Sequence, residues 1–149
     1  MLAEDVTHII IHCAATPPDM NIGARDIDKW HKERGWSGCG YHAVIRRDGT
    51  LQGAEDGCRR MDRVGAHCHG YNRRSVGVCL VGGVDEAGEP ENNFTPEQFV
   101  TLGRVVVDLQ RKFPGAVVCG HRDIPGVTKA CPSFDVAEWL AESAAGEVA

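Results

Sequence analysis

Short apolar runs rich in β-branched residues predict strands at four places in the chain. These runs cover residues 7–13, 41–46, 75–81 and 116–119. The tetrapeptide Arg47-Asp48-Gly49-Thr50 follows the second run, and its Asp-Gly pair predicts a hairpin turn with a return strand from Leu51. The third run is continuously apolar, which is typical of a central strand.

Helical spacing of apolar residues predicts three helices between and after these strands. The first spans residues 23–35, and a short one near Phe134 ends the domain. The second has the strongest start signal: Thr95 as N-cap, Pro96 in the first turn and Gln98 completing a capping box. The resulting order, β-α-β-β-β-α-β-α, indicates an α/β fold with a central mixed β-sheet flanked by helices. We expect a single domain over residues 1–149, with a core from about 7 to 142.

Charge and hydropathy exclude several classes of function. The net charge of −5 argues against direct nucleic-acid binding, which needs a basic surface. No run reaches the ~18 apolar residues of a membrane span, so we expect no membrane insertion. No basic segment precedes an apolar one at the N-terminus, so we expect no signal peptide and synthesis in a cytoplasm. Five arginines form a local basic cluster that is either a solvated loop or a surface facing an anionic partner: Arg59, Arg60, Arg63, Arg73 and Arg74.

The chain has seven cysteines, an odd number, and no Cys-x-x-Cys pair. Without a secretory signal, free thiols are expected rather than a disulfide framework. Most of these cysteines should be small buried side chains, and one could be a metal ligand.

Candidate metal ligands follow two predicted strands. His12 lies at the end of the first strand, and a turn-rich loop after the fourth carries His121 and Cys131. Two imidazoles and a thiolate suit zinc, and three protein ligands leave a fourth position for water. Spacing alone leaves open that these are scattered structural residues. Lys129 precedes Cys131 by two positions.

Further polar candidates lie in the middle of the chain. Tyr41 begins the predicted hairpin, and antiparallel pairing could bring it beside another strand's end. In the triplet His67-Cys68-His69, we expect one histidine to line a site and the other to be exposed. His31, on the first predicted helix, is expected to pack rather than to bind a metal.

Several blocks of sequence, taken in order, match one known pattern: residues 8–16, 30–36, 40–42, 47–50, 65–72, 75–83, 93–96 and 129–135. Blocks this long and ordered are far more specific than one short motif. They resemble the zinc-dependent N-acetylmuramoyl-L-alanine amidases of the second amidase class, especially the T-seven-type phage lysozymes. Peptidoglycan recognition proteins are related to this family.

The resemblance assigns roles to individual residues. It implies one catalytic Zn²⁺ held by His12, His121 and Cys131, with Tyr41 and Lys129 as catalytic side chains. It implies a site-lining, substrate-facing role for His67. The implied reaction is hydrolysis of the amide that joins N-acetylmuramic acid to L-alanine in peptidoglycan.

The resemblance also implies a biological setting. A monomeric phage endolysin would be made in the host cytoplasm and would reach the wall after the membrane is permeabilised. One alternative is a noncatalytic peptidoglycan-binding module, although such relatives commonly lose the zinc cysteine. Another is an additional role as an inhibitor of the phage RNA polymerase. The loop between His121 and Lys129 is slightly longer than in the phage relatives, which leaves the reach of Lys129 open.

Overall fold

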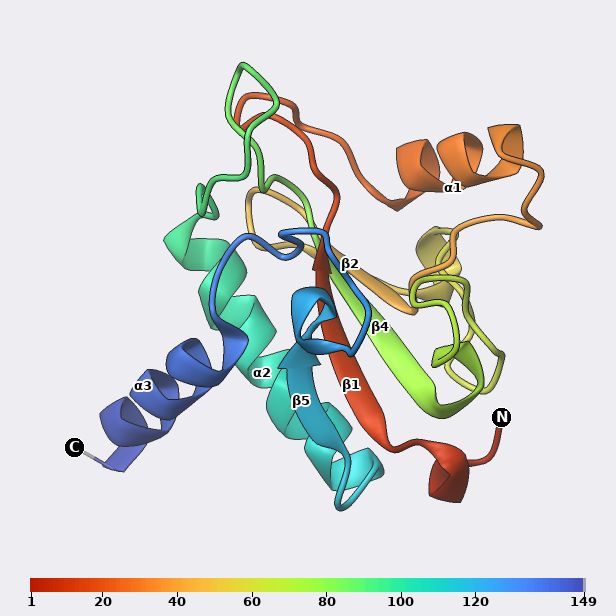
Figure 1. Ribbon diagram of the computed structural model, residues 1–149, viewed down its shortest axis with the longest axis vertical. Coiled ribbons are helices and arrows are strands. Elements are labelled where there is room, and N and C mark those ends of the chain that lie inside the picture. Colours follow the sequence, from red (N-terminus) through yellow and green to blue (C-terminus); the bar gives the residue numbers. More distant parts are fainter. Residues whose placement is uncertain (149) are drawn as a thin grey trace.

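The computed structural model describes residues 1–148 and has one five-stranded sheet covered by helices (Figure 1). Its strand order is β3-β2-β4-β1-β5. β1 runs parallel to both β4 and β5, β2 runs parallel to β4, and β3 pairs with β2 in the antiparallel sense. The strands are β1 (His8–Cys13), β2 (Ala43–Ile45), β3 (Leu51–Gln52), β4 (Ser75–Leu80) and β5 (Val117–Gly120).

Three α-helices complete the predicted order, which is confirmed together with the mixed sheet. They are α1 (Ala24–Glu33), α2 (Pro96–Lys112) and α3 (Val136–Val148). α3 has 13 residues and is longer than the short helix predicted. A 3-10 turn, Ala3–Asp5, precedes β1, and three more lie between the later elements: Ala54–Asp56, Asn72–Arg74 and His121–Asp123. No helix among the described residues is long and apolar enough to cross a membrane.

The two faces of the sheet bury different sets of side chains. One face packs against α2 and α3, through residues such as Ile11, Val78 and Leu102. The other packs against α1, through residues such as Ile27 and Val44. Figure 1 shows α1 and the α2–α3 pair on different sides of the sheet. Because β1 is covered on both faces, its apolar run has no polar alternation.

The predicted start of α2 is also an anchor for the sheet. The Thr95 side chain accepts a hydrogen bond from the Gln98 backbone N–H at 3.1 Å, and the Gln98 side chain accepts one from the Thr95 N–H at 3.0 Å. Gln98 is fully buried, and its amide donates to the carbonyls of Ile45 and Val81 at 3.1 and 2.8 Å. The capping glutamine therefore ties α2 to the ends of β2 and β4.

We expect Gln98→Ala to lower the free energy of unfolding by about 3 kcal/mol, because the buried partners of the amide lose hydrogen bonds. Urea denaturation measures the difference. Gln110→Ala is the matched control, since Gln110 is exposed on the same helix and its replacement should change stability by less than about 0.5 kcal/mol. Equal stability of the two variants would contradict the anchoring role of Gln98.

Two of the five arginines in the cluster form side-chain hydrogen bonds or ion pairs with other described residues. Arg59 donates to the carbonyls of Cys39 and Val64 at 3.3 and 2.7 Å. Arg60 pairs with Asp62 at 2.9 Å. For Arg59 and Arg60, these contacts favour the solvated-loop interpretation over a surface dedicated to an anionic partner.

Candidate metal centre and active site

Neighbouring parallel strands bring His12 and His121 together. Ile11 of β1 pairs with Gly120 of β5, so the residues that follow each of them lie side by side. Their ring centroids are 4.6 Å apart. Both histidines lie at the carboxyl ends of their strands, the edge where open α/β sheets place ligand sites.

Cys131 returns to this edge from the loop after β5. Its Sγ lies 4.0 Å from Nδ1 of His12 and accepts a hydrogen bond from the backbone N–H of Cys13 at 3.3 Å. One ligand atom each from His12, His121 and Cys131 lie within 4.8 Å of one another. All seven cysteines of the chain have free thiols, as predicted.

The ends of the loop between His121 and Cys131 are held close together. The Arg122 N–H donates to the Cys131 carbonyl at 2.8 Å, and the Asp123 carboxylate accepts from the Gly120 N–H at 2.8 Å. Ile124 is buried, whereas Pro125 and Gly126 are exposed. The Pro125-Gly126 step therefore lies on the outside of the loop, while the hydrogen bond between Arg122 and Cys131 holds its two ends together.

Burial keeps the two histidines neutral. It lowers the pKa of His12 well below its usual value, and the nearby charges of His67, His121 and Lys129 add to the effect. Burial and then the charge of Lys129 lower the pKa of His121. Neutral imidazoles keep a lone pair that a metal ion can accept.

The pKa of the Cys131 thiol is raised, in contrast to the lowered pKa values of the two histidines. Its hydrogen bond with the Cys13 thiol, followed by burial, raises its pKa above the usual value. Metal binding at this position must therefore release the thiol proton.

Tyr41 and Lys129 both lie near this cluster. The Tyr41 ring centroid is 5.1 Å from that of His12, and burial raises the pKa of its hydroxyl, which stays a hydrogen-bond donor. The predicted hairpin forms, with β2 and β3 antiparallel, but it does not explain the position of Tyr41. β2 runs parallel to its other neighbour, β4, and the Tyr41 ring reaches His12 from the segment before β2. Lys129 is exposed, and its charge acts on both His12 and His121.

One histidine of the triplet His67-Cys68-His69 is exposed, as predicted, and the other lies beside His12. His67 is half-buried and places its Nδ1 2.9 Å from Nε2 of His12, whereas His69 is exposed. Burial lowers the pKa of His67 to about 3. His31 packs beside Trp36 and accepts a hydrogen bond from the Gly40 N–H at 2.9 Å, a structural role that agrees with the prediction.

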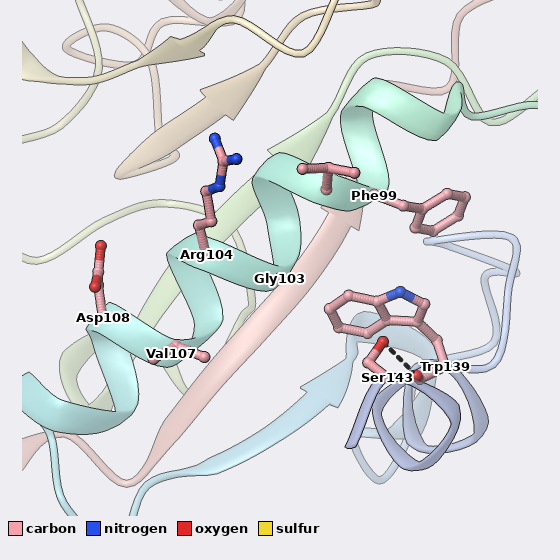
Figure 2. A pocket seen from close by; sticks show the side chains of 8 residues that line it. Phe99, Gly103, Arg104, Val107, Asp108, Trp139 and Ser143 are labelled. Atoms are coloured by element: carbon pink, nitrogen blue, oxygen red, sulfur yellow. Dashed lines mark hydrogen bonds between the residues drawn. The ribbon is translucent and has the colours of Figure 1, made fainter. Parts of the chain in front are cut away.

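A surface groove elsewhere on the molecule contains none of these residues. It lies between α2 and α3, where Phe99 and Trp139 face each other (Figure 2). Arg104 and Asp108 flank it on α2. No nucleophile paired with a base lines this groove, so the strand-end cluster is the better candidate for chemistry.

Sequence reasoning did not identify two contacts of the cluster. One is the Cys13 N–H that donates to Cys131, and the other is Ser75, whose Oγ lies 3.3 Å from Nε2 of His67. A hydrogen bond from a backbone N–H does not depend on residue type, so the sequence cannot indicate it. A serine at the start of an apolar strand is too common to predict a functional contact.

Comparisons with known proteins place the chain in a family. A family model described as N-acetylmuramoyl-L-alanine amidase matches residues 2–134. The endolysin of Klebsiella phage KP32 is 48% identical over 91% of this chain and 86% of its own length, and the endolysin of Escherichia phage T7 is 46% identical over the same shares. The solved structure of the N-acetylmuramoyl-L-alanine amidase LysC from Clostridium intestinale superimposes with a TM-score of 0.76 at 30% identity, covering 95% of this chain and 87% of that one. The chain therefore belongs to the N-acetylmuramoyl-L-alanine amidase family, as its sequence blocks indicated.

Proposed function

We propose that this amidase is zinc-dependent, with His12, His121 and Cys131 as the protein ligands of one catalytic ion. The observation that carries the proposal is the convergence of these ligand atoms within 4.8 Å. Two imidazoles and a thiolate are a typical donor set for zinc, and three ligands leave one position for water. The Cys13 N–H directed at Cys131 Sγ is the kind of supporting contact that stabilises a metal-bound thiolate.

The substrate is peptidoglycan, and the bond cleaved joins the lactyl group of N-acetylmuramic acid to L-alanine. When bound, zinc polarises an amide carbonyl and lowers the pKa of a water molecule to about 7. The Tyr41 hydroxyl, which is held protonated by burial, donates a hydrogen bond to the carbonyl oxygen as negative charge develops on it. The Lys129 ammonium stabilises the same charge from the solvent side.

The leaving amine needs a proton as the amide bond breaks. Tyr41 and Lys129 are the two side chains beside the cluster that carry one, so either can act as the general acid. His67 is held within the cluster by His12 and is assigned no proton transfer.

The setting we propose is host lysis by a phage. The protein acts as a monomer made in the host cytoplasm, and it meets the wall after the membrane is permeabilised. Similarity to the endolysins of phages KP32 and T7 supports this setting. An interaction with a phage RNA polymerase stays a prediction from resemblance.

Purified protein is expected to release stem peptides from bacterial sacculi, and incubation with a chelator should abolish the release. Mass spectrometry of the digests identifies the new ends, and one equivalent of Zn²⁺ should restore activity to the chelated protein. New reducing sugar ends without amide cleavage would contradict the assigned bond. Sacculus binding by zinc-loaded protein without turnover would instead support a noncatalytic binding module.

A further inference from the structure

We propose that His67 is a positioning residue that fixes the proton of His12 on Nε2, so that bare Nδ1 of His12 faces the metal position. This inference rests on the proposed zinc site and goes beyond it, because it assigns the ligating atom and the residue that selects it. It follows from a continuous row of hydrogen bonds that begins at His12 and ends at the Tyr71 backbone carbonyl.

The direction of these hydrogen bonds follows from the last contact. Ser75 Oγ lies 2.7 Å from the Tyr71 carbonyl oxygen, which can only accept, so the serine hydroxyl hydrogen is used there. Ser75 Oγ must then accept from Nε2 of His67 at 3.3 Å. A neutral imidazole that donates through Nε2 has a bare Nδ1.

The same reasoning continues to the metal ligand. Nδ1 of His67 lies 2.9 Å from Nε2 of His12, so the His12 nitrogen must be the donor. The proton of His12 is therefore on Nε2, and its Nδ1 carries a lone pair. That nitrogen is the one that lies 4.0 Å from Sγ of Cys131, on the side where the three ligand atoms converge.

The opposite arrangement would block the site. A hydrogen on Nδ1 of His12 would point toward Cys131 and occupy the direction that a metal ion needs. Since His12 is only 1% exposed, water cannot easily replace His67 as the partner of Nε2. A histidine ligand is commonly oriented by a partner on its other nitrogen, and here that partner is a second histidine.

The fold holds the His67 ring in one place. A Cβ at Gly77 of β4 would come within 2.6 Å of Cγ of His67, and one at Gly65 within 2.8 Å of its Cδ2. Asn72 accepts hydrogen bonds from the backbone N–H groups of His67 and Cys68 at 2.9 and 2.8 Å. The ring therefore occupies space that two glycines leave open, and its backbone is fixed independently.

This arrangement revises the role expected for His67. Both of its ring nitrogens already have partners inside the protein, Ser75 and His12. Neither is free to bind substrate, so His67 acts on the reaction through His12.

Zinc affinity, measured by competition with a chromophoric chelator, tests the proposal. We expect His67→Phe to weaken zinc binding by about 10–100-fold, which is the usual effect of losing an outer-shell partner. His67→Asn should retain most of the affinity, because its amide oxygen can accept from His12 near the position of Nδ1. His69→Asn is the matched control, since His69 is exposed in the same triplet and should bind zinc like the unmodified protein.

A second measurement is independent of zinc. Imidazole ¹⁵N NMR of the metal-free protein should show His12 protonated on Nε2, and His67→Phe should remove this preference. His12 protonated on Nδ1 in the unmodified protein, or equal zinc affinity in folded His67→Phe, would overturn the proposal. If the unmodified protein bound no zinc while His12 kept its proton on Nε2, the zinc assignment would fail and the orienting role of His67 would stand. If His67→Phe does not fold, the NMR measurement on the unmodified protein still decides the proposal, since His12 protonated on Nδ1 would overturn it.

Discussion

Cys131→Ser is expected to remove most of the bound zinc and to reduce amide hydrolysis by more than about 100-fold, since losing a ligand should exceed the loss of a supporting contact. A serine hydroxyl is a far weaker zinc ligand than a thiolate. The fold should persist because the core is formed by the apolar faces of the sheet, and Cys131 only packs at the edge of one of them.

Elemental analysis of the purified variant measures the metal, and peptide release from sacculi measures the activity. Cys119→Ser is the matched control, because Cys119 is also a half-buried free thiol but lies outside the ligand cluster. The control should keep its zinc and its activity. Unchanged zinc content in Cys131→Ser would show that the ligand assignment is wrong.

Lys129→Met should lower kcat by about 10²–10³-fold, the usual effect of losing one group that stabilises an oxyanion. Its zinc content should not change, because Lys129 is not among the three converging ligands. The side chain is exposed, so the free energy of unfolding should change by no more than about 0.5 kcal/mol. If turnover falls while zinc content and stability are unchanged, Lys129 acts on the reaction without being a zinc ligand.

Turnover of soluble muropeptides gives kcat and KM separately for this variant. Lys112→Met is the control. Lys112 is exposed at the end of α2, outside the ligand cluster, so its replacement removes one positive charge without touching the proposed site and measures any general electrostatic effect. Near-normal kcat in Lys129→Met would place the lysine outside the chemistry, and a raised KM alone would assign it to substrate binding.

The order and type of the elements could be predicted from local signals. Thr95, Pro96 and Gln98 predict the start of α2 because capping involves neighbours in the sequence. The same signals do not show that Gln98 also bonds Ile45 and Val81, since those contacts depend on how α2 packs on the sheet. The order of the strands in the sheet also cannot be predicted from these signals, because an apolar run does not specify which strand it pairs with.

Only part of the site could be predicted from the sequence. His12 and His121 could be placed at strand ends, but their proximity depends on β1 and β5 being neighbours in register. Cys131 was predicted as a ligand from its residue type and from resemblance, and in the structure its thiol lies with the two histidines at the same edge of the sheet. Tyr41 lies near His12 as expected, but the antiparallel hairpin of β2 and β3 does not place it there, since Tyr41 precedes β2.

The pairing of β1 with β5 links metal supply to the amount of folded protein. His12 and His121 are distant in sequence and meet only when the two strands are in register, so the unfolded chain offers no assembled three-ligand site. With zinc bound as proposed, an ion that binds only the native state shifts the folding equilibrium by mass action, by about 2.7 kcal/mol at a free concentration 100 times its Kd. A compartment poor in free zinc would then hold less of this enzyme in the protease-resistant native state, even at an unchanged rate of synthesis.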